Sequence, residues 1–193
     1  GEPILLRMVT RLAHSRSGVE TKALKQQNEM SFSDDPKQFI LLPGIARRRY
    51  KELIAKQEDF VKASEESPYN KYIDGPNKKL GIVACGIGFN YLMENYPDGC
   101  EYPVLKIGQY PLPKKQLTQL ISECDEILVL EDGQPFVERL IGGYLGNAVK
   151  VKGRLDGTLS RDGELNPDSV AKAVGKENKS TFTIPNVVEM RPP

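Results

Sequence analysis

Hydrophobic residues follow two different patterns along this chain. From residue 80 onward, short continuous apolar runs alternate with stretches in which apolar residues recur every three or four positions. The runs at 80–85, 102–107 and 127–130 predict buried β-strands, and a weaker run at 149–151 predicts a fourth. The periodic stretches that begin near Ile87, Pro113, Pro135 and Asn166 predict amphipathic helices.

This alternation of strands and helices indicates the fold class. Strands alternating with helices of about ten residues are typical of an α/β domain with a mainly parallel sheet. Right-handed crossovers place helices on both faces, so we expect a three-layer open sheet. Proline at the first helical position, Asn166 as an N-cap and Gly175 after the last helix mark the helix ends.

The first 79 residues have a different pattern. Residues 4–10 are strand-like and run into a polar loop, and the segments 21–42 and 67–79 are polar connectors. Between them, apolar residues recur at helical spacing among charges, which predicts an amphipathic helix at about 46–62. We therefore divide the chain into a lead-in at 1–20, a polar connector with one helix at 21–79, and an α/β domain at 80–193.

Composition limits the classes of partner. The 193 residues carry a formal net charge of +1, so composition gives no argument for a nucleic acid or an anionic membrane as a partner. The three cysteines are widely spaced, without a disulfide framework or a C-x-x-C pair, so we expect a reducing cytoplasm and no iron–sulfur ligands in this chain. The first residue is Gly1, and we expect the chain to be a piece of a longer protein.

Two glycines follow the first predicted strand of the α/β domain. Gly86 and Gly88 stand where a dinucleotide-binding fingerprint would begin, but Tyr91 occupies the position of its third glycine. A tight structural turn is the favoured interpretation, and an anion at the helix N-terminus is the alternative. Cys85, which ends the strand, is expected to be an inert buried side chain.

Two carboxylates follow the strand at 127–130. Glu131 and Asp132 lie at the carboxyl end of a strand, the edge at which open α/β sheets bind ligands. They could serve a partner subunit, a metal or an acid–base step. The favoured interpretation is a turn whose acid caps the next helix.

Basic residues gather at two places in the first 60 residues. Arg47, Arg48 and Arg49 begin the predicted amphipathic helix, and such a run usually marks a solvated face; an interface with an acidic partner surface is the alternative. Arg11 and the single histidine, His14, lie in a polar loop in which arginine could clamp a carboxylate.

Four segments, taken together, carry a family resemblance. They are Pro3-Ile4-Leu5-Leu6-Arg7 with Thr10-Arg11-Leu12-Ala13-His14-Ser15, Leu105-Lys106-Ile107-Gly108 with Tyr110-Pro111-Leu112-Pro113, Ile127-Leu128-Val129-Leu130-Glu131-Asp132-Gly133, and Gly163-Glu164-Leu165-Asn166-Pro167-Asp168. In this order they resemble the alpha subunit of indolepyruvate ferredoxin oxidoreductase, of the 2-oxoacid:ferredoxin oxidoreductase family. The resemblance implies oxidative decarboxylation of aryl-2-oxoacids to acyl-CoA, with thiamine diphosphate, magnesium and iron–sulfur clusters as cofactors. It also implies a beta subunit, ferredoxin and coenzyme A as partners.

The departures from the family pattern locate the chain within such a subunit. None of the five Asp-Gly pairs is preceded by the glycine of the Gly-Asp-Gly metal motif of thiamine enzymes. The resemblance therefore implies a middle, transketolase C-terminal-like domain that builds an interface, binds no cofactor and holds no catalytic residue, preceded at 1–20 by the end of a thiamine-pyrimidine domain. The resemblance also implies that Arg11 is the arginine that holds the substrate carboxylate in relatives with Arg-Thr-Ser-His, although two of those four positions differ here.

Other functions stay open at this point. The same domain could come from a pyruvate or 2-oxoglutarate ferredoxin oxidoreductase. The chain could also be a stand-alone α/β module that binds an anionic small molecule at Gly86 and Gly88.

Overall fold

The computed structural model describes residues 4–145, 150–160 and 163–176. Its internal contacts divide the chain into two compact units, residues 1–59 and 60–193. The second unit contains the sheet, and it takes in part of the stretch that we predicted to be a polar connector. Each unit is described by itself below.

A five-stranded sheet forms the centre of the 60–193 unit. The strands β2 (Leu80–Cys85), β3 (Val104–Ile107), β4 (Glu126–Leu130) and β5 (Lys150–Lys152) are joined by parallel pairings, and β1 (Lys71–Ile73) pairs antiparallel with β3. The order across the sheet is β1-β3-β2-β4-β5. The prediction of a mainly parallel sheet is confirmed; position 149 of the last predicted strand lies outside the described residues.

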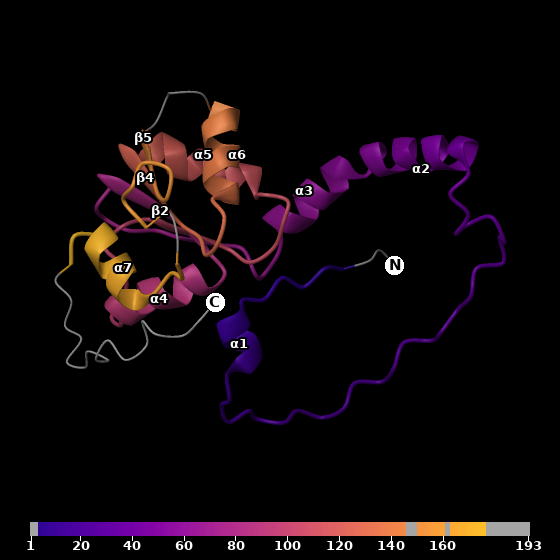
Figure 1. The fold of residues 1–193 in the computed structure, drawn as a ribbon, viewed down its shortest axis with the longest axis horizontal. Coiled ribbons are helices and arrows are strands. Elements are labelled where there is room, and N and C mark those ends of the chain that lie inside the picture. The colour runs from indigo at the N-terminus through magenta and orange to yellow at the C-terminus, as the bar shows by residue number, and fades with distance from the viewer. Residues whose placement is uncertain (1–3, 146–149, 161–162, 177–193) are drawn as a thin grey trace, which may run out of the picture. The chain divides into compact units, whose positions relative to one another are not determined.

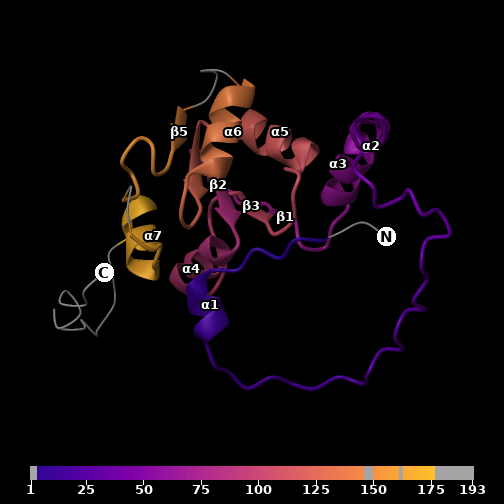
Figure 2. The same ribbon diagram turned by 45° about the vertical axis from the view of Figure 1, so that its right-hand side comes forward.

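Helices cover both faces of this sheet (Figures 1 and 2). On one face lie α4 (Ile87–Asn95) and α7 (Pro167–Ala173), which contact each other. On the other lie α5 (Lys114–Glu123) and α6 (Phe136–Leu145). The three-layer α/β architecture expected from the sequence is therefore confirmed.

An apolar cluster fills the layer between the sheet and the helices α5 and α6. Inward-facing strand residues meet the apolar stripes of the helices there, and the buried members are Val83, Cys85, Leu105, Ile107, Leu112, Leu117, Leu120, Cys124, Ile127, Val129, Val137 and Ile141. Central strands buried on both faces explain why the sequence shows continuous apolar runs rather than alternation. Cys85 is buried, as expected, and the inertness of its thiol stays a prediction.

The N-terminus of α7 is closed by the predicted cap. The Asn166 side chain accepts a hydrogen bond from the Ser169 backbone N–H at 2.9 Å, and the Ser169 hydroxyl accepts one from the Asn166 N–H at 3.2 Å. This reciprocal pair satisfies two donors that a helix start otherwise leaves unpaired. Gly175 follows the helix with a positive φ of 74°, as its predicted position after the helix end requires.

The strand β1 was not predicted from the sequence. It lies within the stretch 67–79, which we expected to be an irregular connector, and that expectation is wrong for residues 71–73. Of the three residues of β1, only Tyr72 and Ile73 are apolar. A short strand at the edge of a sheet pairs with one neighbour and needs little apolar surface. Tyr72 packs against the core cluster, and its hydroxyl donates to Glu123 Oε2 at 2.6 Å.

Around the boundary between the two units at residue 59, two helices replace the single helix that was predicted. The predicted helix at 46–62 is present but is interrupted at Lys56, where α2 (Pro43–Ala55) ends and α3 (Gln57–Glu65) follows. The predicted strand-like start is wrong. Residues 4–9 have no regular structure, and α1 (Thr10–His14) forms where we expected a loop.

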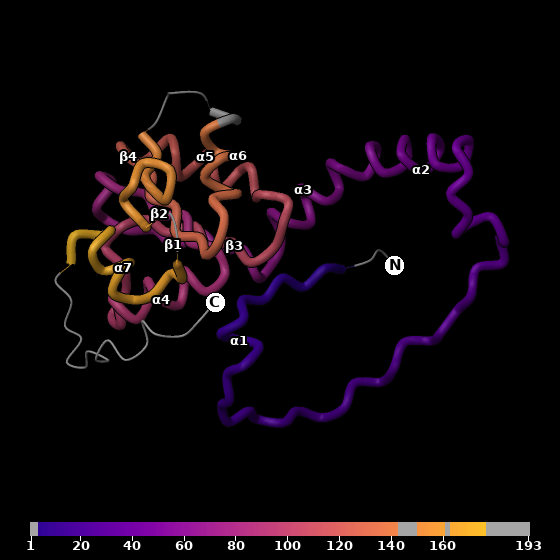
Figure 3. The backbone as a smooth tube through the Cα atoms, in the orientation of Figure 1, coloured from indigo at the N-terminus to yellow at the C-terminus, as the bar shows by residue number. Residues whose placement is uncertain are grey.

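The 1–59 unit has no buried core among its described residues. None of residues 4–59 is classed as buried, and 15–42, which Figure 3 traces as a continuous tube, contain neither helix nor strand. A strand-like pattern needs a partner strand to pair with, and the described part of this unit supplies none.

Candidate functional site at the carboxyl edge of the sheet

Three parallel strands end at the same edge of the sheet. In the register, Cys85 lies opposite Ile107, and Ala84 lies opposite Leu130. The residues that follow these strands are therefore neighbours, and they include the predicted site residues Gly86, Gly88, Glu131 and Asp132.

Gly86 and Gly88 are required by packing and backbone conformation. Gly86 has φ +53°, which side chains other than glycine rarely adopt, and its N–H donates to Ile107 O at 3.0 Å. A Cβ on Gly88 would lie 2.7 Å from Leu130 O, so the start of α4 lies directly against the end of β4. The geometry supports the favoured interpretation of a tight turn. An anion at this helix start stays a prediction.

Glu131 is a buried carboxylate that caps α6. Its Oε2 accepts from the Val137 N–H at 2.9 Å and its Oε1 from the Glu138 N–H at 3.1 Å. Burial raises the pKa of the Glu131 carboxyl, and these backbone N–H groups act in the opposite direction. Both oxygens are thus engaged in ending the strand and starting the helix, which favours the capping role over acid–base chemistry.

A second buried carboxylate, Glu138, holds the loop that follows β5. Its Oε2 accepts from the Arg154 N–H at 2.8 Å, and its Oε1 accepts from the Leu155 N–H at 2.9 Å. Gly153 has no room for a side chain, since a Cβ there would lie 2.6 Å from Glu138 Oε2. The periodicity predicts only a helix around position 138, because it does not indicate a bond to residues 16 or 17 positions away.

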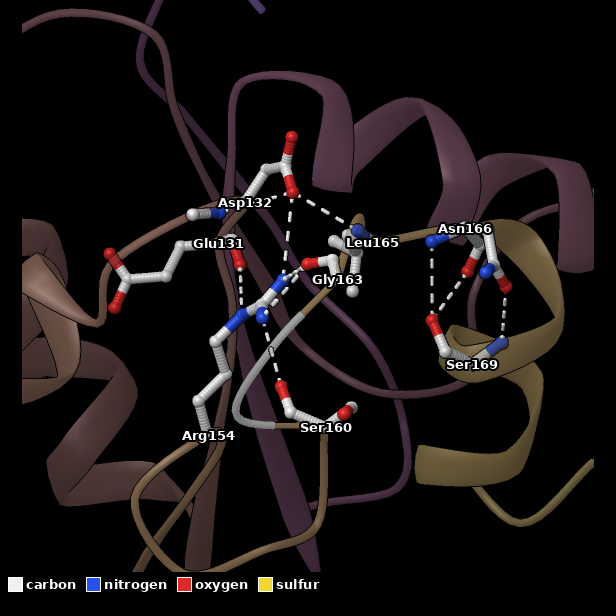
Figure 4. Close-up of polar contacts among 9 residues, drawn as sticks. Glu131, Asp132, Arg154, Ser160, Gly163, Leu165, Asn166 and Ser169 are labelled. Atoms are coloured by element: carbon white, nitrogen blue, oxygen red, sulfur yellow. Dashed lines mark hydrogen bonds and ion pairs between the residues drawn. The ribbon is translucent and has the colours of Figure 1, made fainter. Parts of the chain in front are cut away.

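Arg154 connects this loop to the end of β4 (Figure 4). Its side chain is 3% exposed; Nε donates to Glu131 O at 3.1 Å, and Nη1 donates to Ser160 O at 2.8 Å. Both Nη atoms lie 3.3 Å from Gly163 O, and Nη2 lies 3.5 Å from Asp132 Oδ1.

Asp132 completes this cluster from the strand side. Its Oδ1 also accepts from the Gly133 and Leu165 N–H groups, each at 3.0 Å. One aspartate and one arginine thus join the end of β4, the segment 153–160 and the residues Gly163 and Leu165 before α7. The arrangement is typical of a structural role, in which a buried guanidinium donates hydrogen bonds to several acceptors at once and so holds separate segments together.

A second polar cluster, missed by sequence analysis, lies at the end of β3. The Asn70 side chain accepts from the Gly108 and Gln109 N–H groups, both at 2.9 Å, and it donates to Ser64 O at 2.9 Å and Gln109 O at 3.0 Å. Ser64 is fully buried, and its hydroxyl donates to Pro111 O. The only sequence signal was a Ser-Pro-x-Asn stretch, which indicates a turn but not its partner.

The predicted basic residues belong to the 1–59 unit. Arg11 and His14 lie on α1 and are exposed, and Arg47, Arg48 and Arg49 lie on α2. Arg49 Nη1 lies 3.0 Å from Glu52 Oε2, and Arg48 Nε lies 3.8 Å from Glu52 Oε1. These exposed pairs contribute little to stability.

Within residues 4–145, 150–160 and 163–176, the side chains do not fit the metal ion that accompanies thiamine diphosphate. In the part of the chain that the structure describes, no three His, Cys, Asp or Glu side chains are grouped closely enough to hold a metal ion. The carboxylates at the sheet edge are engaged by backbone N–H groups and Arg154. Within the same described residues, no helix is long and apolar enough to cross a membrane.

Comparison with known proteins identifies relatives over nearly the whole chain. No protein-family profile matches it. Indolepyruvate oxidoreductase subunit IorA of Methanothermobacter thermautotrophicus is 35% identical over 181 residues, which is 90% of this chain and 29% of that protein. The subunits of the same name from Methanothermobacter marburgensis and Archaeoglobus fulgidus are 31% and 29% identical, over 99% and 91% of this chain and 33% and 28% of their own lengths.

The chain therefore spans about a third of the length of the curated relatives that it matches. The four segments that carried the resemblance lie in a sequence that aligns almost throughout. The chain is thus similar, over nearly its whole length, to part of subunit IorA of indolepyruvate oxidoreductases, and the family resemblance is confirmed.

Proposed function

We propose that this chain is the middle α/β segment of an indolepyruvate:ferredoxin oxidoreductase alpha subunit. The observation that carries the proposal is the similarity of nearly the whole chain to one third of subunits named IorA. The complete enzyme would convert aryl-2-oxoacids to acyl-CoA and reduce ferredoxin, with a beta subunit, coenzyme A, thiamine diphosphate and iron–sulfur clusters supplied outside this segment. We place it in the cytoplasm, because its three free thiols are compatible with a reducing compartment.

Within that enzyme, the segment serves as a structural and interface domain of the transketolase C-terminal-like kind. Its division into 1–20, 21–79 and 80–193 follows the change of sequence pattern at residue 80. The acids at the ligand-binding edge support a structural role, because Glu131 and Glu138 use both carboxylate oxygens to hold backbone N–H groups. A group engaged in this way is poorly placed to exchange a proton with a substrate.

A replacement experiment tests the proposal. The aligned third of the Methanothermobacter thermautotrophicus IorA subunit is replaced by this chain, and the chimera is assayed with its partner subunit, indolepyruvate, thiamine diphosphate, coenzyme A and a redox acceptor. We expect indolepyruvate-dependent reduction by the chimera and none by the isolated chain. Sustained turnover by the isolated chain, or a folded chimera without turnover, would contradict the proposal.

Calorimetry separates this function from a stand-alone anion-binding module. The isolated chain is titrated with ADP and with acetyl-CoA, two anions that suit a helix N-terminus. We expect no measurable heat of binding. The positive φ of Gly86 and the close packing of Gly88 each account for a glycine at that position without a bound anion. Tight binding, abolished by a bulky substitution at Gly86, would favour the module.

A further inference from the structure

The helix α2 carries an apolar stripe whose large side chains are left exposed by the described residues of its own unit. Tyr50, Leu53 and Ile54 are 63%, 47% and 53% exposed. With 100° between successive residues, these three and Ala46 fall within an arc of about 100°, which is the width of a core-facing stripe. We call these four residues the α2 stripe.

A comparison within the same chain shows what such a stripe normally does. The helix α5 has its apolar residues at the same spacing, and its Leu117 and Leu120 are 8% and 0% exposed because they pack against the sheet. The α2 stripe has the apolar spacing of a packed helix, but its Tyr50, Leu53 and Ile54 side chains are exposed. The segment before it also exposes apolar side chains, with Phe39 at 81% and Leu41 at 83%.

Basic side chains border the α2 stripe on both sides. On the same helical projection, Arg47 and Lys51 lie along one border and Arg49 along the other, while Arg48 and Glu52 lie opposite. The helix holds four cations against the single acid Glu52. A surface that complements the stripe therefore has an apolar groove with carboxylates along its sides.

We propose that the α2 stripe docks into an acid-bordered apolar groove on the part of the oxidoreductase subunit that this chain does not include. The proposal rests on the function proposed above, and the occupant follows from length as well as charge: the relatives are about three times as long as the matched segment. A protein surface is favoured over a lipid surface because the chain as a whole is nearly neutral.

Amide hydrogen exchange of α2 tests the docking in the chimera described above. We expect α2 amides to exchange at least about tenfold more slowly in the chimera than in the isolated chain, because docking must be broken before they open. Leu53→Ser combined with Ile54→Ser should remove this difference. The matched control is Leu24→Ser, at a residue that is fully exposed and outside α2, and it should leave the difference unchanged.

The charged border is tested separately. Arg47→Glu combined with Lys51→Glu should reduce the slowing about tenfold, and the loss should be smaller at high salt, because opposed charges at a partly exposed interface are screened. Arg48→Glu is the control, since Arg48 lies on the opposite side of the helix. Equal loss from the control would overturn the charge complementarity.

Several other results would overturn the docking. One is equal exchange of α2 in the chimera and the isolated chain; another is aggregation of the chimera, which would mean that the stripe stays uncovered.

Slow exchange in the isolated chain would assign the stripe to a second copy if sedimentation shows a dimer, or to the chain's own 60–193 unit if it shows a monomer. Slowing only with phosphatidylserine vesicles would assign it to a lipid surface. Because exchange is measured apart from turnover, a protected but inactive chimera contradicts the proposed function alone.

Discussion

Arg154 holds more of the sheet's carboxyl edge together than any residue singled out from the sequence. Its guanidinium donates to carbonyls from three separate places along the chain and lies beside Asp132. A buried acceptor that loses its donor pays the full cost of desolvation, so one side chain here supports several backbone groups.

We predict that Arg154→Met lowers the free energy of unfolding by about 3 kcal/mol or more, because three carbonyls lose the guanidinium as donor and the Asp132 carboxylate loses its cationic partner. Methionine preserves much of the apolar length, so the loss reports the guanidinium. Urea unfolding followed by circular dichroism measures it. Arg139→Met, at an exposed position on α6, is the control and should change little; an equal effect at both sites would contradict the role of Arg154.

Acid sensitivity is predicted at Glu123. Hydrogen bonds from Tyr72, Lys78 and Gln119 lower the pKa of Glu123 to about 2. A carboxyl whose folded pKa is depressed stabilises the fold above its unfolded pKa of about 4.5, and that stability is lost as the pH falls toward 2. Glu123→Gln should therefore flatten the decline in melting temperature between pH 4.5 and 2, while Glu94→Gln, at an exposed site, should leave it unchanged.

Arg11 is predicted to bind substrate in the assembled enzyme. If it holds the carboxylate of the 2-oxoacid, Arg11→Met in the chimera should raise KM for indolepyruvate about tenfold or more, since a hydrogen bond to a charged group contributes about 1.5–3 kcal/mol. The value of kcat should change far less. Arg16→Met, in the same exposed segment, is the control. An unchanged KM would remove Arg11 from the substrate site.

The roles of some residues at the carboxyl edge of the sheet could be predicted from the sequence. Glu131 is expected as a capping acid because an acid between a strand and a helix has an obvious local partner, and the structure supports that interpretation. Arg154 and Asn70 could not be predicted in these roles. Their bonds reach residues 23 and 39 positions away, and such partners depend on the folded topology rather than on local pattern.

At the scale of single elements, strong periodicity was a reliable guide. The strand β2 has the bounds that its apolar run predicts, and α5 begins at Lys114, one residue after the predicted start, with Pro113 as its N-cap. The elements missed are short: β1 has three residues and α1 has five, too few for either period to appear. Lys56 interrupts the predicted long helix although the apolar spacing continues across it.

Helix α4 depends on a glycine for its close approach to β4. We predict that Gly88→Ala lowers the free energy of unfolding by about 1–3 kcal/mol, because the added methyl would lie 2.7 Å from Leu130 O and the helix must shift. Gly142→Ala in α6, where a Cβ meets nothing within 4 Å, should instead raise it by about 0.5–1 kcal/mol. Thermal unfolding compares the two; a stabilising Gly88→Ala would contradict the close packing.

At the scale of the whole molecule, stability is expected to reside in the 60–193 unit. We predict that a chain of residues 57–193, which retains α3, unfolds in a single transition with a melting temperature within about 5 °C of the full chain, because no described residue of 4–59 is buried. Calorimetry measures both. A fall of more than about 10 °C would mean that the first 59 residues contribute stabilising contacts.

The Asn70 cluster has a mechanical consequence. Ser64 lies near the end of α3, and Asn70 ties that point to the carboxyl end of β3 through bonds to Gly108 and Gln109. We therefore expect tension on the preceding segment to load these hydrogen bonds before it separates β1 from the edge of the sheet. In a longer subunit, the hydrogen bonds of Asn70 would hold the end of α3 in place when the preceding segments are pulled or rotated. The order of the strands in the sheet would then be unaffected.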